Sequence, residues 1–203
     1  MTRFEESVLD GLKEIVNIGV GRAAGSLNDL TSAHVTLQVP MVLQTCSEDI
    51  FSSILPAEQS FIAINLDYTG AFSGTTALIF PRESADKLVF LLTGESTRTD
   101  DNDELWRMAL IEVGNIVVNA VMGSITNILG GKLEFLLPGY LEESMEKILH
   151  SPMFIKGEDL VVAHAVFHVE KKGIEGKIMI ILGGQSIRIL GEKIQKKMDT
   201  LRK

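Results

Sequence analysis

The sequence contains few of the residues that form a chemical site by themselves. Cys46 is the single cysteine among 203 residues, which excludes a disulfide framework and a cysteine-rich metal cluster. It stands in a mixed apolar and polar stretch, where we expect a small packed residue rather than a nucleophile. No apolar run reaches the roughly 20 residues that a membrane-spanning helix needs. The charged N-terminus, MTRFEESVLDGLKE, does not resemble a signal peptide. These absences favour a globular protein in a reducing, cytoplasmic setting.

Positive charge is also scarce. Lys and Arg number 19 against 27 Asp and Glu, which gives a net charge of −8. Nucleic acids and anionic membrane surfaces repel such a protein, so we expect neither as a partner. An acidic surface suits a protein partner instead. The length and the 45% hydrophobic content allow one large domain or two small ones.

Several familiar sites are missing as well. The segment GVGRAAG at 19–25 lies inside a helical pattern and follows no strand, so it does not indicate a nucleotide-binding loop. There is no GKS or GKT phosphate loop and no convincing Ser/His/Asp order. His164 and His168 stand four apart, but their segment alternates with period two. The two side chains would then lie roughly 13 Å apart along a strand, so we expect no metal site there.

One pattern occurs twice. In each copy a glutamate precedes an asparagine by three residues, and a proline follows the asparagine by twenty-three. The matching positions are Glu14, Asn17 and Pro40 in the first copy and Glu112, Asn115 and Pro138 in the second. Corresponding residues are 98 apart. We infer an internal duplication, with repeat 1 at about 4–95 and repeat 2 at about 104–202.

The first copy lies on a segment, 4–29, with helical periodicity. On a helix, Asp10, Glu14, Asn17 and Gly21 fall within roughly 60° of one another. The opposite side carries the apolar and small residues Val8, Leu12, Ile15, Gly19 and Ala23. The apolar stripe should face a core, and the polar stripe should face water. Glu14 and Asn17 can therefore contact one object together, and Gly21 leaves room for its approach.

Both repeats show the same order of elements. Repeat 1 predicts helices at 4–29 and 84–92, strands at 34–39, 61–66 and 75–80, a second short strand at 41–45, and an irregular stretch at 46–59 with a helical turn near 51–55. Repeat 2 predicts helices at 104–129 and 185–202, strands at 132–137, 160–169 and 177–182, and an irregular stretch at 139–158. The first strand of each repeat should end at its proline. The polar run 96–103 marks the boundary.

Three strands alone make a poor core, so the two repeats should share one sheet. We expect a single α+β domain over residues 1–203 with pseudo-two-fold symmetry. The two motif helices should lie side by side on one face of the shared sheet.

A glutamate and an asparagine are too few groups for a self-contained hydrolase. A carboxylate can bind a lysine of a partner, and an amide can hold one water molecule in a fixed direction. Orientation of water by a carboxamide is used in GTP hydrolysis. The pair could therefore complete an active site that lies mostly on another protein.

The stretches LKEIVNIGVGRAAGSL and ALIEVGNIVVNAVMGSI resemble the two motifs of the CheC-type chemotaxis phosphatases. In that family, Asp or Ser stands four residues before the Glu, and Pro follows the Asn at the spacing found here. The first copy matches the pattern with Asp10. The second copy has Met108 where Asp or Ser is usual. The resemblance covers essentially the whole chain.

The resemblance implies a substrate, the phosphoaspartate of a CheY-like response regulator. It implies that Glu14 and Glu112 dock against the regulator's lysine, and that Asn17 and Asn115 orient the attacking water. Asp10, Gly21 and Met108 would border the partner. The phosphatase would need no cofactor of its own, because the regulator holds the Mg²⁺.

Related proteins leave alternatives open. CheX-type proteins usually carry one motif and dimerise, and the flagellar-switch relatives FliM and FliY carry added segments. A second function class is a non-catalytic binding module of the same fold, which binds a receiver domain or the receptor deamidase CheD. The intact Glu/Asn pairs favour the phosphatase, and Met108 gives the binding module some weight. A phosphate-release assay would separate the two.

Overall fold

The computed structural model describes residues 6–46, 60–95, 98–144 and 159–201. The first half contains α1 (Glu6–Thr31), β1 (Val35–Cys46), β2 (Ser60–Gly70), β3 (Gly74–Pro81) and α3 (Arg82–Thr93). The second half contains a short 3-10 helix η1 (Asp100–Asn102), α4 (Asp103–Leu129), β4 (Leu133–Phe135), β5 (Gly139–Ser144), β6 (Asp159–Val169), β7 (Ile174–Gly183) and α6 (Gly184–Leu201). The predicted helices and most predicted strands are confirmed. The expected turn near 51–55 lies outside the described residues.

The seven strands of the described ranges join one antiparallel sheet in the order β1-β6-β7-β3-β2-β4, with β5 also paired to β2. The two halves exchange their outer strands. β1 of the first half pairs with β6 of the second, and β4 and β5 of the second half pair with β2 of the first. The centre is the β3–β7 pair. The shared sheet that the sequence predicts is therefore present.

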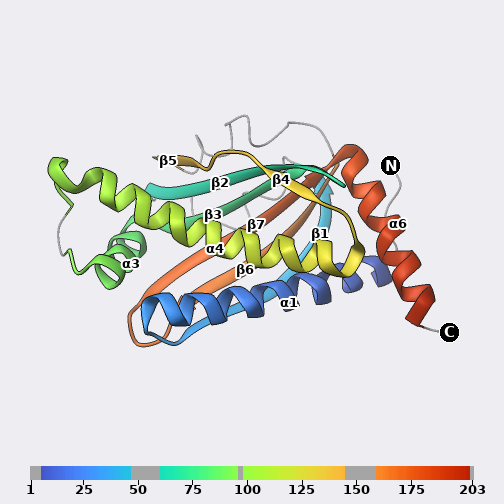
Figure 1. Ribbon diagram of the computed structural model, residues 1–203, viewed down its shortest axis with the longest axis horizontal. Coiled ribbons are helices and arrows are strands. Elements are labelled where there is room, and N and C mark those ends of the chain that lie inside the picture. Colours follow the sequence, from blue (N-terminus) through green and yellow to red (C-terminus); the bar gives the residue numbers. More distant parts are fainter. Residues whose placement is uncertain (1–5, 47–59, 96–97, 145–158, 202–203) are drawn as a thin grey trace.

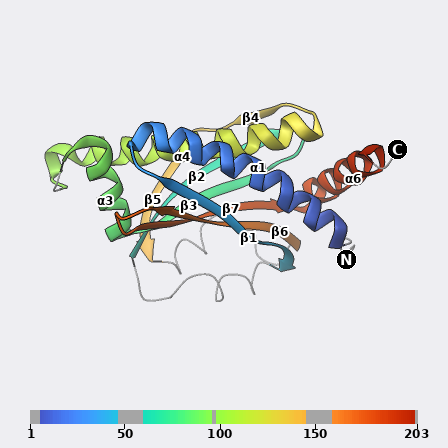
Figure 2. The same cartoon turned by 90° about the horizontal axis from the view of Figure 1, so that it is seen from below.

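The long helices α1 and α4 lie side by side on one face of this sheet and run in opposite directions (Figure 1). The view turned by 90° shows both on the same side of the strands (Figure 2). α3 and α6 stand at opposite ends of the layer. The predicted pair of motif helices on one face is confirmed.

Alternation along the strands places one apolar set under the helices. In β6 the buried core residues are Val161, Ala163, Ala165, Phe167 and Val169. His164 and His168 belong to the other face, as the period-two pattern predicts. Burial and the nearby Lys177 lower the pKa of His164. Within the described ranges, no group of three or more His, Cys, Asp or Glu side chains could hold a metal ion.

Reciprocal contacts tie the two halves together. The Ser84 hydroxyl in α3 accepts a hydrogen bond from the Glu175 N–H of the other half, at 3.2 Å. The Ser186 hydroxyl in α6 accepts one from the Ser73 N–H, at 2.8 Å. The last helix of each half, α3 or α6, therefore contacts the strand hairpin of the other half. These contacts and the strand order are those expected of halves around a two-fold axis between β3 and β7, and the superposition of the halves stays a prediction.

β1 does not end at its proline. Its register on β6 shifts between Gln38 and Met41, where Val39 and Pro40 together face one residue of β6. The predicted strands 34–39 and 41–45 are thus one strand with a bulge. The prediction that the strand ends at Pro40 is wrong, because a proline lacks only its own N–H and is tolerated at a bulge.

The corresponding link in the second half shows the same insertion. Asn65 pairs with Gly139 and Tyr68 pairs with Phe135, so the three residues 136–138 face two residues of β2. The predicted strand 132–137 is shortened to β4. Residues 139–144, which the sequence analysis assigned to an irregular stretch, form β5. The remainder of that stretch, 145–158, lies outside the described residues.

α4 also explains why composition can mislead. Together with η1 it is long and apolar enough to cross a membrane by those criteria alone. Half of its most apolar window is buried inside the protein, against α1 and the sheet. Core helices of soluble proteins pass the same test, so length and composition alone do not identify α4 as a membrane span.

Candidate functional site

The first motif lies on the outer side of α1. The inner side is buried at Val8, Leu12, Ile15, Gly19 and Ala23, which are the predicted core positions. Asp10, Glu14 and Gly21 are exposed, and Asn17 is half-buried. An alanine Cβ at Gly21 would meet nothing within 4 Å, so the backbone beside the pair is open to an approaching surface.

The second motif lies on α4 in the same way. Trp106, Leu110, Val113 and Val117 are buried. Glu112 is exposed, Asn115 is half-buried, and Met108 is 59% exposed. Gly114, next to Asn115, packs against β2, where an added Cβ would lie 2.7 Å from Ile64 Cγ2. The sheet therefore fixes the orientation of this helix just where the pair is carried.

A close crossing sets the spacing of the two motifs. At Gly19 an added Cβ would lie 2.6 Å from the Val121 Cα, so the two helix backbones nearly touch. Next to it, Arg22 donates a hydrogen bond to the Ser124 hydroxyl at 3.0 Å. Because the helices run in opposite directions, Asn17 and Asn115 lie on either side of this crossing. A rise of 1.5 Å per residue puts them roughly 12 Å apart along the helix axes.

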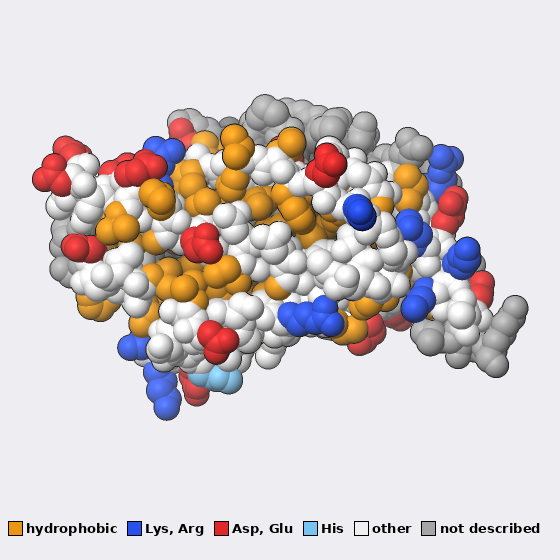
Figure 3. All heavy atoms as spheres, in the orientation of Figure 1, with side chains coloured by type: hydrophobic (Ala, Val, Ile, Leu, Met, Phe, Trp, Pro, Cys, Tyr) orange, Lys and Arg blue, Asp and Glu red, His pale blue; other side chains and the backbone are white. Residues whose placement is uncertain are grey.

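The motif side chains are available to a partner. In the part of the chain that the structure describes, no hydrogen bond or ion pair engages Asp10, Glu14, Asn17, Glu112 or Asn115. On the face that carries both helices, acidic side chains gather near the start of α4 and stand singly among hydrophobic ones over the middle (Figure 3). The structure thus presents two separate carboxylate–amide pairs, and it does not bring the two pairs together into one site.

An ionic network flanks the N-terminal end of α4. Arg98 contacts Asp103 at 2.6 Å and Glu142 of β5 at 2.7 Å, and Arg82 also pairs with Glu142. Burial alone would lower the pKa of Arg98, but its hydrogen bonds to Glu142 and Asp103 raise it. The sequence analysis missed this network, because its members are far apart in the chain and share no spacing rule.

An aromatic contact extends the network to the helix surface. The Arg107 guanidinium lies 4.9 Å from the centre of the Tyr140 ring. Burial is the main cause that raises the pKa of Tyr140. α4 is therefore held against β5 over the turn that precedes Met108.

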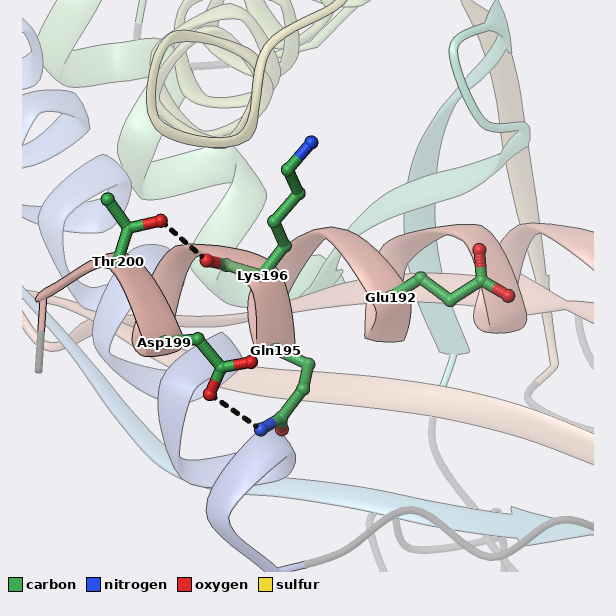
Figure 4. A pocket seen from close by; sticks show the side chains of 5 residues that line it. All are labelled: Glu192, Gln195, Lys196, Asp199 and Thr200. Carbon is green, nitrogen blue, oxygen red and sulfur yellow. Dashed lines mark hydrogen bonds between the residues drawn. The ribbon is translucent and has the colours of Figure 1, made fainter. Parts of the chain in front are cut away.

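A hollow of about 670 Å³ lies elsewhere, on α6. Its lining residues are Glu192, Gln195, Lys196, Asp199 and Thr200, all from one helix (Figure 4). Gln195 bonds to Asp199, and Thr200 bonds to the Lys196 carbonyl. These side chains interact within their own helix and do not converge on a ligand position.

Exposed hydrophobic residues mark the region beside α4. Leu136 is 55% exposed and Leu137 is 93% exposed in the link between β4 and β5. The sequence pattern could not reveal this exposure, since a strand was expected through 137. The only signal was the proline that follows.

Comparisons with known proteins agree with the motifs. No family model matches the chain. The CheC1 protein of Halobacterium salinarum is 23% identical over 172 residues, which cover 84% of this chain and 87% of that protein. The CheY-P phosphatase CheC of Bacillus subtilis is 24% identical over 146 residues, covering 70% of this chain and 68% of that protein.

Solved structures share the fold. Thermotoga maritima FliY has a TM-score of 0.76 at 19% identity and covers 97% of this chain and 100% of its own. A chain of the CheX–CheY–BeF3–Mg complex from Borrelia burgdorferi has a TM-score of 0.55 at 15% identity, covering 85% of this chain and 99% of its own. In fold and in sequence along most of its length the chain is similar to CheC, CheX and FliY proteins, and it carries both copies of the Glu–Asn motif.

Proposed function

We propose that this protein dephosphorylates the phosphoaspartate of a CheY-like receiver domain. One observation carries the proposal. An exposed carboxylate and a half-buried amide stand one helical turn apart, twice, and nothing in the described part of the chain engages them. Groups held in this way on rigid helices are placed to act on a partner. A receiver substrate also places the reaction in the cytoplasm.

The chemistry assigned to the amide is positioning. Asn17 or Asn115 would enter the receiver's active site and hold a water molecule in line with the phosphorus–oxygen bond of the phosphoaspartate. The water oxygen bonds to phosphorus as that bond breaks, which restores the aspartate carboxylate and releases phosphate. Placement of water in line is the main protein contribution in such transfers.

The chemistry assigned to the carboxylate is docking. Glu14 or Glu112 would accept hydrogen bonds from the ammonium group of the receiver's active-site lysine. The helix then enters in one register, with the amide one turn further along. The pairing strengthens when the partner excludes water from it.

The Mg²⁺ of the reaction belongs to the receiver in this proposal. This chain would supply the Glu/Asn pair and bind no metal itself.

The relatives support the choice of substrate. Bacillus subtilis CheC is named a CheY-P phosphatase, and the Borrelia complex pairs CheX with CheY in the presence of BeF3 and Mg. The acidic net charge of −8 fits a protein partner with an exposed lysine.

Phosphate release from a phosphorylated receiver tests the proposal. Asn17→Ala combined with Asn115→Ala should lower the rate of phosphate release about 100-fold, the size of loss that follows when a reacting group is misplaced. Circular dichroism should be unchanged, because neither side chain is buried. Asn127→Ala, an exposed asparagine on another side of α4, is the matched control and should be neutral. A fully active double variant would refute the proposal.

A binding module is the second candidate, and Met108 is the observation that favours it. A methionine cannot replace the carboxylate of Asp10, but it packs well at a partner surface. Tight binding of an activated receiver or of CheD, without any phosphate release by the wild-type protein, would establish this alternative.

A further inference from the structure

An apolar rim borders the second motif, at positions that are mostly polar or buried in the first copy. We define the rim as Leu105, Met108, Leu136 and Leu137, which are 45%, 59%, 55% and 93% exposed. Leu105 and Met108 share the outer stripe of α4 with Glu112 and Asn115, since these positions fall within about 80° on a helix. Leu136 and Leu137 come from the β4–β5 link.

Contacts to the sheet place that link beside the motif. The Leu136 N–H donates to the Asp67 carbonyl of β2 at 2.9 Å. Gly114 of α4 packs against Ile64 and Leu66 of the same strand. The link therefore passes α4 at the level of Asn115, and the ribbon shows it running alongside the helix (Figures 1 and 2).

The other side of the link is fixed by a second contact. Tyr140, just after the link, lies under Arg107 of α4. Between these two anchor points lie residues 108–113 on the helix, which include Met108 and Glu112, and residues 137–139 after β4. On this face the hydrophobic side chains gather over α4 and the link (Figure 3).

The first motif has a different border. The positions that correspond to Leu105 and Met108 are Ser7 and Asp10, both polar. The position that corresponds to Leu137 is Val39, which is 5% exposed and belongs to the core. Ile18, beside Asn17, is 45% exposed, so the first site has one apolar neighbour of its own on the helix. The two sites therefore differ at the three positions compared, and only the second has exposed leucines on a neighbouring link.

We infer that Leu137 and Met108 are contact residues for the receiver at the second site and set its affinity there. This rests on the proposed function. Leu105 and Met108 lie on the same stripe as Glu112 and Asn115, and the link passes α4 at their level, so a receiver that reaches this pair comes close to Met108 and Leu137. Exposed apolar side chains that a partner buries contribute strongly to binding. The net charge of −8 disfavours an anionic lipid surface as the occupant.

The test isolates each site with a background variant. In Asn17→Ala, turnover comes from the second site, and in Asn115→Ala it comes from the first. Leu137→Ser should raise KM for the phosphorylated receiver about 10-fold in the Asn17→Ala background with kcat little changed, because burying one leucine is a uniform binding contribution. In the Asn115→Ala background, Leu137→Ser should leave KM unchanged. Val166→Thr, an exposed valine on the opposite sheet face, is the control and should be silent in both backgrounds.

Three outcomes would overturn the inference. The first is an unchanged KM for Leu137→Ser in the Asn17→Ala background. The second is an equal rise in both backgrounds, which would indicate a general effect on the fold. The third is a wild-type dimer, seen by light scattering, that Leu137→Ser converts to a monomer, because the rim would then bind a second copy. A wild-type protein with no activity on any receiver would instead refute the proposed function itself.

Discussion

The strand β1 and the link from β4 to β5 occupy equivalent places in the two halves, yet the side chain before the proline is buried in one and exposed in the other. Each carries one extra residue at a proline, and each borders the other half's hairpin. In β1 the residue before the proline, Val39, is buried in the core. In the link the corresponding Leu137 is almost fully exposed. Both halves have the backbone irregularity, but the side chain before the proline packs in the core in one half and is exposed to solvent in the other.

The contrast extends to charge. In the second half, Tyr140 and Glu142 join the network of Arg98, Arg82 and Arg107. The corresponding residues of the first half are Val42 and Gln44, which cannot form ion pairs. The constant parts of the two halves are the helix, the bulge and the Glu/Asn pair. The variable part is the border, and we expect it to influence how each pair meets a partner.

The largest expected effect is a difference in activity between the two Glu/Asn pairs. Under single-turnover conditions we expect Asn17→Ala to lose more activity than Asn115→Ala, with a loss of about 100-fold at the affected site. Asp10 stands one turn before Glu14 and can accept a hydrogen bond from a water molecule or a partner donor, whereas Met108 accepts one poorly. Rapid-quench measurement of phosphate release would show the difference. Equal losses would mean that the position of Asp10 is dispensable, and a larger loss from Asn115→Ala would mark the Met108 site as adapted.

A second prediction concerns the crossing of α1 and α4, where the halves are not equivalent either. Gly19 corresponds to Val117, and only the glycine allows the backbones to meet. Gly19→Ala should lower the free energy of unfolding by about 2 kcal/mol, because its Cβ would overlap the Val121 backbone.

Gly25→Ala is the matched control on the same helix. Its Cβ would meet nothing within 4 Å, so the higher helix propensity of alanine should raise stability by about 0.5–1 kcal/mol. Urea titration of both variants would show whether the free energy of unfolding falls in Gly19→Ala and rises in Gly25→Ala. If Gly19→Ala were as stable as the wild type, the crossing would be looser than the structure shows.

The smallest expected effect is a change in thermal stability at the ionic network of the second half. Asp86 lies near Arg82, Arg98 and Glu142, and burial raises the pKa of its carboxyl. One of its oxygens is buried without a hydrogen-bond partner. The folded state then binds the proton more tightly than the unfolded state, so this group lowers stability as the pH rises through the acid range.

Asp86→Asn should therefore raise Tm modestly at pH 7 to 8. The gain should shrink below about pH 4, where the carboxyl is protonated in both states. Differential scanning calorimetry across this range would show the trend. A lower Tm at neutral pH would mean that attraction to the arginines exceeds the penalty of burial.

The sequence predicts the parts of the molecule that follow from short-range periodicity. The faces of α1, the alternation of β6 and the glycine that ends α3 all depend on neighbours within one or two turns. Gly94, for example, adopts a positive φ of 78° and donates its N–H to the Phe90 carbonyl, as a helix-ending glycine should.

The same reasoning fails where the structure of a segment depends on pairing with a strand far along the chain. A proline predicts a strand end when the sequence is considered alone, but the ladder on either side of Pro40 is held by β6, far along the chain. The exposure of Leu137 likewise depends on how β4 and β5 share β2. The motif residues were found from their repetition, and their rim could be found only from the packing.

The exchange of outer strands has a consequence for how the chain reaches this state. Val35 in β1 has its partner, Val169, in β6, so β1 cannot complete this pairing until the chain has been made as far as β6. Until then the newly made first half exposes an unpaired strand and a hairpin with an open edge. Such distant pairing slows folding and exposes the chain to aggregation during synthesis. We therefore expect the yield of folded protein to depend on how well this first half is protected during synthesis, by a chaperone or by fast docking of α1.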